Sequence, residues 1–330
     1  MNNLAERAKI RATVIRALRA FFDDRGFVEV DTPVALTAMA PESHIEAPSV
    51  VLHLEKGSYR RYLQTSPELP MKRLLAAGLP QIYQIAPVFR DGDLSPQHRP
   101  EFRLLEWYRR DQDWTILLDD CQDLVRSCAT AIEADCLRVG DRRISIGSEF
   151  ARLSVDAAFC QYAGFSILDA LDLETLQGCA SRAGVHFEPS DDWNDLFHRV
   201  FLNLVEPSLA AFAKPLFLTD YPAPLASLAR LNPRDPRTAE RFELFVGGIE
   251  LANGFGELTD AAEQRRRFAV ESIRRAEAGQ ANYPDDERFF AALEQLPTAV
   301  GIALGVERLL MLLFGANDID AISLLPWEET

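Results

Sequence analysis

The sequence lacks the features that place a protein in a membrane or send it out of the cell. No uninterrupted apolar run approaches the roughly 20 residues that a membrane-spanning helix requires. The opening residues, Met-Asn-Asn-Leu-Ala-Glu-Arg, do not follow the basic-then-apolar order of a secretion signal. These two absences predict a cytoplasmic protein that has no membrane partner.

Cysteine is scarce and is not spaced for metal or redox chemistry. Five cysteines stand at positions 121, 128, 136, 160 and 179, and no two of them form a Cys-x-x-Cys pair. An odd number without that pair argues against a zinc site or a redox disulfide. Cys121 and Cys128 lie seven residues apart in a helical pattern, which is typical of small core residues on one helix face.

An excess of positive charge is also missing. The chain carries 35 basic and 50 acidic side chains, which gives a formal net charge of −15. Proteins that hold nucleic acid through its phosphates usually present a basic face. The charge balance therefore argues against a large RNA footprint, and we expect no stable binding of tRNA, although a local basic patch would be compatible with the same total.

Apolar residues are plentiful and fall into patterns of helices and strands. With 330 residues, 48% of them hydrophobic, the chain can bury one large core or two modest ones. Helical spacing predicts a helix over Leu4–Phe22, closed by Gly26, and a second helix from Pro67. Strand patterns follow at 27–30, 50–54, 60–64, 81–90 and 101–109, and the polar loop 91–100 joins the last two as a long hairpin.

The second half of the chain completes a mixed pattern. Residues 114 to about 209 are mostly helical and resemble an insertion between two parts of a sheet. The last third indicates a strand–turn–strand over 241–255, helices over 260–278 and 285–296, a strand over 300–306 and a final helix. No repeat or flexible linker divides the chain. We predict one α+β domain over residues 1–330, with an antiparallel β-sheet flanked by helices.

Two glutamates flank a tight turn in a way that suits a metal ion. Gly247-Gly248 predicts a two-residue hairpin turn, which would make Glu243 face Ala252 and place Glu243 and Glu250 on one side of the sheet. Two close carboxylates repel each other unless one binds a proton or a cation lies between them. Magnesium prefers such oxygen ligands. The competing interpretation is a pair of solvated glutamates on an exposed sheet face.

The same strand carries two further polar residues whose direction is open. Simple alternation sends Asn253 and Glu257 to the side opposite Glu250. A bulge at Gly254 or Gly256 would return them to the same side. The sequence alone does not decide between these two arrangements.

Two arginines are placed for binding phosphate. Arg90 ends the first strand of the long hairpin, and Arg308 opens the last helix, where the helix dipole disfavours a cation unless an anion is bound. Gly301 and Gly305 allow a ligand to approach the backbone closely. The spacing of these glycines does not match a dinucleotide-binding fingerprint. Glu68, at a helix start, and Glu106 with Tyr108, on one strand face, are ordinary when each is taken alone.

Taken together, these segments resemble the signature motifs of class II aminoacyl-tRNA synthetases. Residues 26–33 resemble motif 1, which forms a dimer interface; residues 88–90 and 99–102 resemble motif 2; residues 301–308 resemble motif 3. The segments 65–68, 71–74, 105–108 and 248–255 are similar to lysyl-tRNA synthetase. The resemblance covers nearly the whole chain and implies a homodimer.

The chain begins only one helix ahead of motif 1, so we expect no anticodon-binding domain like that of those enzymes. This truncated form is similar to the elongation factor P lysine ligase family. The resemblance implies ATP-dependent activation of (R)-β-lysine or lysine as an adenylate, and transfer to a lysine side chain of elongation factor P. Two other functions stay open, namely a minimal synthetase that charges tRNA and a catalytically impaired paralogue that only binds lysine and ATP.

The resemblance also implies roles for individual residues. Arg90 and Arg308 are the expected catalytic residues, which bind the α-phosphate with the substrate carboxylate and the γ-phosphate respectively. Glu243 and Glu250 are expected to hold Mg²⁺. The residues expected to bind the amino acid are Ser66, Pro67, Glu68, Tyr108, Asn253, Glu257 and Ala303. Those expected to bind ATP are Arg90, Asp91, Gly92, Arg99, Glu250, Leu251, Gly305 and Arg308.

The chain departs from the synthetase motifs at a few positions. Gly92 stands where motif 2 has glutamate, which keeps the impaired paralogue open unless a neighbouring aspartate compensates. Gly256 replaces a larger residue, and Glu307 replaces the usual aspartate of motif 3. Ala303 stands where lysyl-tRNA synthetases have glycine and the ligase family has alanine. One methyl group in a binding pocket changes the discrimination between substrates by roughly 1–3 kcal/mol, so this alanine favours the ligase.

Overall fold

An eight-stranded sheet forms the centre of the protein, whose computed structural model describes residues 4–329. The strand order is β1-β5-β6-β13-β12-β11-β10-β9. The interior pairs are antiparallel, as predicted, and the two edge pairs, β1 with β5 and β10 with β9, are parallel. The strands are β1 (Val28–Glu29), β5 (Gln81–Phe89), β6 (Glu101–Arg110), β9 (Ala151–Ser154), β10 (Leu216–Thr219), β11 (Arg241–Val246), β12 (Ile249–Gly256) and β13 (Ala299–Gly305).

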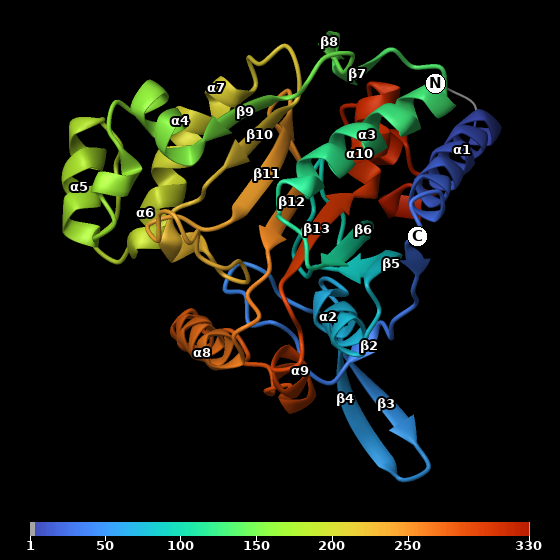
Figure 1. Ribbon diagram of the computed structural model, residues 1–330, viewed down its shortest axis with the longest axis horizontal. Coiled ribbons are helices and arrows are strands. Elements are labelled where there is room, and N and C mark those ends of the chain that lie inside the picture. The colour runs from blue at the N-terminus through green and yellow to red at the C-terminus, as the bar shows by residue number, and fades with distance from the viewer. Residues whose placement is uncertain (1–3, 330) are drawn as a thin grey trace.

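Three helices cover one face of this sheet, namely α1 (Leu4–Asp23), α3 (Ile116–Ala131) and α10 (Val306–Phe314) (Figure 1). Their apolar faces and the sheet form the largest core, in which Phe22 stacks on Tyr83 with 4.5 Å between ring centroids. Helix α1 begins and ends close to its predicted bounds, and Gly26 after it has a φ of 73°, as its left-handed position requires. The α+β architecture predicted from the sequence is confirmed.

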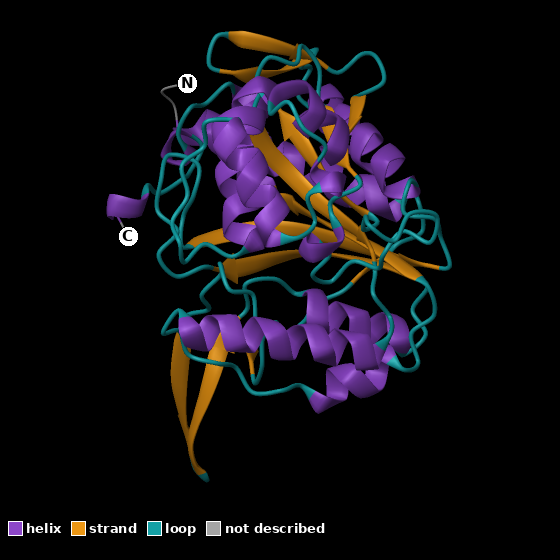
Figure 2. Ribbon diagram, turned by 90° about the vertical axis from the view of Figure 1, so that its left-hand side faces the viewer, coloured by secondary structure: helices purple, strands orange, loops and turns teal. Residues whose placement is uncertain are grey.

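A second group of helices lies beyond the other face of the sheet, and Figure 2 shows the sheet between the two groups. This group consists of α2 (Glu68–Ala76), α8 (Ala261–Glu277) and α9 (Glu287–Leu293). Leu75 of α2 and Phe289 of α9 belong to its buried core. Between this group and the sheet the strands present polar side chains, so this is the side on which a ligand can reach the sheet.

The middle segment contains more than the predicted helices. Helix α3 packs in the main core, and a small hairpin of β7 (Cys136–Val139) and β8 (Arg142–Ser145) precedes the edge strand β9. Helices α4 (Val155–Tyr162), α5 (Leu173–Arg182), α6 (Trp193–Val200) and α7 (Glu206–Leu209) form a separate core against β10 and β11. Short strands such as β9 carry too few residues for alternation to reveal them.

A hairpin of β3 (Ser49–Leu54) and β4 (Gly57–Leu63) projects from the body of the protein and pairs with β2 (Ala35–Leu36) at its base (Figure 1). Val51, Leu52, Leu54 and Tyr59 are exposed on it. Among residues 4–329, no helix is long and apolar enough to cross a membrane.

Candidate active site

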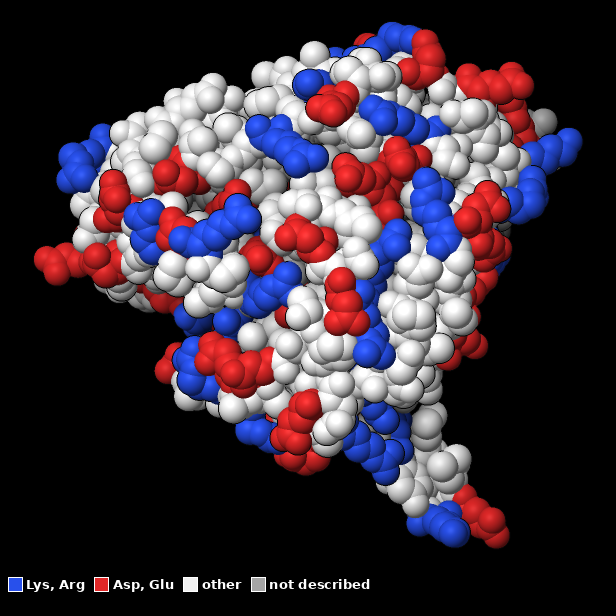
Figure 3. All heavy atoms as spheres, in the orientation of Figure 1, with Lys and Arg blue, Asp and Glu red and all other residues white. Residues whose placement is uncertain are grey.

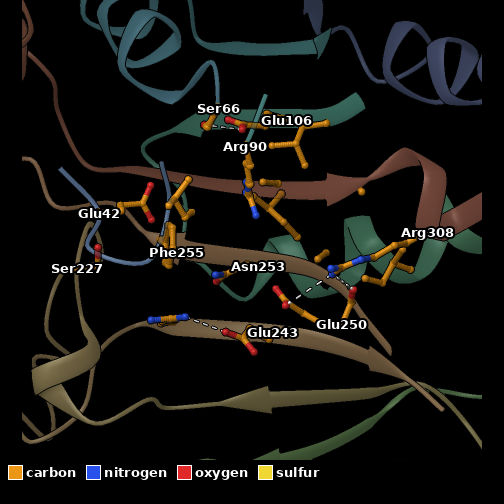
Figure 4. Close-up of a pocket in the computed structure, with 18 of the residues that line it drawn as sticks. Glu42, Ser66, Arg90, Glu106, Ser227, Glu243, Glu250, Asn253, Phe255 and Arg308 are labelled. Atoms are coloured by element: carbon orange, nitrogen blue, oxygen red, sulfur yellow. Dashed lines mark hydrogen bonds and ion pairs between the residues drawn. The ribbon is translucent and has the colours of Figure 1, made fainter. Parts of the chain in front are cut away.

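A cavity of about 470 Å³ lies on the face of the sheet formed by β6, β13, β12 and β11. Its walls bring together residues that are far apart in the sequence, from motif 2, motif 3 and the glycine-turned hairpin (Figure 4). In this view Glu250 and Arg308 lie side by side, whereas Ser66 and Glu106 lie together at some distance from them. The cavity therefore has two chemically different ends.

The turn between β11 and β12 forms as predicted, but the register beyond it differs from the prediction. Gly247 and Gly248 both have positive φ, and the strands pair correctly next to them. A β-bulge then leaves Leu251 without a cross-strand partner. Glu243 consequently pairs with Asn253 and not, as simple counting predicted, with Ala252.

This bulge decides the direction of the polar residues on β12. One extra residue reverses the alternation, so that Glu250, Asn253 and Glu257 all line the cavity. The sequence left this point open and placed the possible bulge at Gly254 or Gly256. The structure places it before those two glycines.

Arg308 stands at the first end of the cavity, in the first turn of α10. Its guanidinium donates to the backbone oxygen of Glu250 at 2.7 Å and lies 2.6 Å from Nε2 of His98. Burial, followed by the charge of Arg308, lowers the pKa of His98, so this imidazole is neutral and accepts the hydrogen bond. His98 was not predicted as a site residue, although it belongs to the polar loop between β5 and β6.

Arg90 follows β5 and reaches the same cavity. Its guanidinium carbon lies 5.2 Å from the centre of the Phe102 ring, which holds the planar group over an apolar surface. Its buried Nε has no hydrogen-bond partner within residues 4–329. An unsatisfied buried donor destabilises the unliganded protein, and a bound phosphate or carboxylate oxygen would satisfy it. Arg90 is therefore suited to bind such an oxygen.

Glu243 and Glu250 both face the cavity from neighbouring strands. The Glu243 carboxylate accepts a hydrogen bond of 2.8 Å from Arg241. Burial raises the pKa of Glu250, and the charge of Glu243 raises it further, while Arg308 lowers it. The two carboxylates are therefore close enough for their charges to oppose each other, and a cation between them would relieve the repulsion.

This donor set fits magnesium. Residues 4–329 contain no cluster of three or more acidic, histidine or cysteine side chains arranged for a metal. Magnesium does not need such a cluster, because it is usually held by one or two carboxylates with waters and substrate phosphates completing its coordination. Glu243 and Glu250 are the residues that would hold it here.

At the other end, three charged side chains form a buried group. Lys72 is inaccessible to solvent, and its Nζ lies 2.6 Å from Oε1 of Glu68 and 2.5 Å from Oε2 of Glu257. Both glutamates were predicted to bind ammonium groups of the amino acid, whereas Lys72 was not predicted to take part. Two signals in the sequence could have found it, namely its spacing of four residues from Glu68 and its place in the segment 71–74 that resembles lysyl-tRNA synthetase.

A hydrogen-bonded chain of side chains lies next to this group. Ser66 and Tyr108 each donate to the Glu106 carboxylate, at 2.7 and 2.8 Å. Burial is the largest influence on Glu106, and it raises the pKa of this carboxyl to about 8. The sequence placed Glu106 beside Tyr108 but gave it no role; the structure places it in the wall of the cavity.

Most of the predicted site residues meet in this cavity, and a few do not line it. Those that line it are Ser66, Glu68, Arg90, Arg99, Tyr108, Glu243, Glu250, Leu251, Asn253, Glu257, Ala303, Gly305 and Arg308. Pro67, Asp91 and Gly92 are outside its lining. Arg99 lines it, but its guanidinium already bonds to Asp318, at 3.1 Å, and to Asp320.

Two of the sequence departures have local explanations. Gly92 adopts a φ of 81°, which a glutamate would adopt only with strain. A β-carbon at Gly256 would meet the ion pair of Arg230 and Glu240, so this pair occupies the space of a larger side chain.

Glu307 has partners that tie elements together. It accepts from Arg11 of α1 and from the backbone N–H of Arg103, each at 2.8 Å.

The antiparallel sheet and the three motifs that meet on it define a class II aminoacyl-tRNA synthetase catalytic domain. Residues 1–329 match the family model of class II tRNA synthetases of the D, K and N group. The chain is also similar to proteins named elongation factor P–(R)-β-lysine ligase. It is 38% identical to that of Vibrio cholerae over 97% of this chain and 94% of the relative.

Other relatives agree over the same span. The elongation factor P–(R)-β-lysine ligases of Vibrio vulnificus and Proteus mirabilis are each 38% identical, over 98% of this chain and over 96% and 94% of their own lengths. The chain belongs to the elongation factor P–(R)-β-lysine ligase family.

Proposed function

We propose that this protein activates (R)-β-lysine, or lysine itself, with ATP and transfers the acyl group to a lysine side chain of elongation factor P. The observation that carries the proposal is one cavity lined both by the two arginines Arg90 and Arg308 and by a carboxylate-rich group around Lys72. The relatives named for this activity match nearly the whole chain.

The first half of the reaction joins the amino acid to AMP. A carboxylate oxygen of the amino acid attacks the α-phosphorus of ATP, the bond to the bridging oxygen breaks, and pyrophosphate leaves with the electron pair. Arg90 can hold the attacking carboxylate and the α-phosphate together, and Arg308 can hold the γ-phosphate. The two guanidinium groups then stabilise the negative charge that develops on the phosphates in the transition state. Mg²⁺ on Glu243 and Glu250 would supply further charge neutralisation on the phosphates.

The second half needs no nucleophile from this chain. The neutral amine of the acceptor lysine attacks the acyl carbon of the adenylate, the bond to the phosphate oxygen breaks, and AMP leaves. An amide is formed and one proton is released. The enzyme positions the two reactants and protects the adenylate, which is a mixed anhydride, until the amine attacks.

The carboxylate-rich end explains the choice of amino acid. Glu68, Glu106 and Glu257 line it, and Tyr108 donates into it. An ammonium group of the substrate can bind to these acidic side chains and add positive charge beside that of Lys72, whereas a neutral analogue adds none. This favours a diamino acid over the other amino acids of similar length.

We also propose that the enzyme is a homodimer, that it works in the cytoplasm, and that it holds no tRNA stably. On the face shown in Figure 3, acidic and basic side chains are interspersed, which supports a protein acceptor more than a polyanionic one.

Two assays test the proposal together. Pyrophosphate exchange with ATP should depend on added (R)-β-lysine or lysine, and radiolabelled amino acid should then appear on elongation factor P as an alkali-stable amide. Label on tRNA and not on the factor would favour the minimal synthetase. Binding of lysine and ATP without any exchange would favour the impaired paralogue.

A further inference from the structure

Lys72 is the one lysine among residues 4–329 that is fully buried beside the amino acid end of the cavity, and its surroundings are specific. It lies on α2 one turn after Glu68, so the two side chains leave the same helix face. Glu257 comes from the opposite side, directly after β12. The ammonium of Lys72 thus joins the helix and the strand end across the pocket, at 2.6 and 2.5 Å from the two carboxylates.

Burial of a lysine is costly unless its charge is matched. Burial lowers the pKa of Lys72, but the charges of Glu257 and Glu68 outweigh that effect and raise it above the ordinary value, so the side chain stays an ammonium. The effect is mutual. Burial raises the pKa of Glu257, and the ammonium of Lys72 is the largest influence that opposes the rise.

Other charged groups face Glu257 from each neighbouring element. Glu68 on α2 raises the pKa of Glu257, and Arg230, in the loop before β11, lowers it. Glu106 and Tyr108 on β6 lie close enough to sense the charge of Glu257. Of these neighbours, Lys72 is the only one that contacts both Glu257 and Glu68.

We propose that Lys72 is a specificity-determining residue that clamps Glu68 to Glu257 and so sets the distance between the two carboxylates that receive the ammonium groups of the substrate. The proposal rests on the proposed function, because it assumes that a diamino acid occupies this end of the cavity. Lys72 touches the carboxylates and not the reacting atoms, so it is a positioning residue.

The balance of charge in the pocket supports this role. Glu106 is mostly protonated at neutral pH, because burial raises its pKa to about 8, so Glu68 and Glu257 are the two carboxylates that share the one ammonium of Lys72. This group keeps a negative charge, which an ammonium group of the substrate can neutralise.

Without Lys72 the pocket would lose the contact that holds Glu68 near Glu257, and it would lose one positive charge. In a variant with Met at this position, Glu257 would keep its burial and lose the main influence that lowers its pKa, so it would be protonated at neutral pH. A protonated carboxyl binds an ammonium group poorly. Raising the pH would then restore the charge of Glu257 and part of the affinity, which a purely structural defect would not allow.

The test uses pyrophosphate exchange with (R)-β-lysine, α-lysine and ornithine, which is one methylene shorter than α-lysine. For Lys72→Met at pH 7, we expect KM for the preferred isomer to rise about tenfold or more, with a smaller change in kcat. The ratio of kcat/KM between the preferred isomer and ornithine should fall toward one. From pH 7 to 9, KM should fall more for the variant than for the wild type.

Two controls keep the result interpretable. Lys56→Met makes the same chemical change at the exposed tip of the β3–β4 hairpin and should leave all constants unchanged. Lys72→Arg keeps the charge and should recover part of the affinity, which also covers the case in which Lys72→Met does not fold.

An unchanged or lower KM for folded Lys72→Met, with unaltered discrimination, would overturn the inference; a lower KM would mean that Lys72 competes with the substrate instead of preparing its site. If Lys72→Met is unfolded, a Lys72→Arg variant whose KM rises less than about tenfold supports the clamp, and one whose KM rises about tenfold or more while its melting temperature is unchanged overturns it. If the wild-type protein itself shows no exchange with any of these amino acids, the proposed function has failed, and that failure is separate.

Discussion

A β-carbon added to Gly301 would lie 2.2 Å from Cε1 of Tyr108, closer than any two unbonded carbon atoms can approach. Gly301 on β13 pairs with Tyr108 on β6, and the tyrosine ring covers the space above the glycine. The same added carbon would lie 2.3 Å from Oε1 of Glu257. The missing side chain at Gly301 therefore creates the space that Tyr108 and Glu257 occupy at the amino acid end of the cavity.

Gly301→Ala should consequently damage the pocket. The added methyl group must displace Tyr108 and Glu257, so we expect a loss of about 1–3 kcal/mol in the free energy of unfolding and a clear rise in KM for the amino acid. Thermal denaturation and pyrophosphate exchange measure the two effects. Gly147→Ala is a matched control, because no atom lies within 4 Å of the added carbon there. A Gly301→Ala variant as stable and active as this control would contradict the packing described.

Arg308→Ala should stop amino acid activation without unfolding the protein. The guanidinium bonds to the backbone of Glu250 and to His98 at the phosphate end, and its loss removes positive charge where charge develops. We expect the exchange rate to fall by about 100-fold or more. Arg143→Ala, at an exposed ion pair on β8, should keep wild-type activity. If the two variants exchange pyrophosphate equally well, Arg308 does not bind phosphate.

Glu250→Gln tests the magnesium assignment. The neutral amide keeps the size of the side chain but removes the negative charge that attracts Mg²⁺. The Mg²⁺ concentration for half-maximal exchange should therefore rise by about tenfold or more, and the maximal rate should fall. A titration of exchange rate against Mg²⁺ gives both values. Glu149→Gln, on an exposed loop, should reproduce the wild-type curve. Identical curves for all three proteins would remove Glu250 from the metal site.

The Glu106 carboxyl makes the stability of the protein depend on pH. Its pKa is raised to about 8 in the folded protein, mainly by burial, whereas an ordinary glutamate titrates near 4.5. Between these two values the folded state binds the additional proton, so the free energy of unfolding falls as the pH rises from about 5 to 8. Glutamine at this position carries no such proton and does not show the effect.

Melting temperatures of the wild type and Glu106→Gln, measured from pH 5 to 9, check this sign. We expect the wild type to lose a few degrees relative to the variant across that range. Because Glu250 and Glu257 are present in both proteins, the difference reports the titration of Glu106 together with its interaction with Glu257. Curves that stay parallel would show that Glu106 has an ordinary pKa.

The sequence was informative where a residue type has a single structural use. Gly247 and Gly248 predicted a hairpin turn, and helical spacing predicted α1, because each pattern is local. The bulge at Leu251 was not predictable from counting, since β-branched, apolar and glycine residues on either side of it would also suit a regular strand. A shift of one residue decided whether Asn253 faced the cavity.

Residues that act through long-range contacts were harder to predict. His98 meets Arg308 across 210 positions of the sequence, and Lys72 meets Glu257 across the pocket, so no spacing rule connects them. The edge strand β9 was missed for a related reason. It is short and pairs with β10 far along the chain, and its apolar residues resemble those of the helices around it.

The hydrogen bond between Arg11 and Glu307 connects helix α1 to the residue next to Arg308, at the phosphate end of the cavity. Glu307 is the immediate neighbour of Arg308, and its other oxygen accepts from the backbone N–H of Arg103, directly after motif 2. A rotation of α1 would therefore reorient two catalytic motifs at once. Since α1 leads into motif 1, the proposed association of two copies at that motif would change the rate of adenylate formation. Dilution below the dissociation constant would then reveal the coupling as a concentration-dependent specific activity.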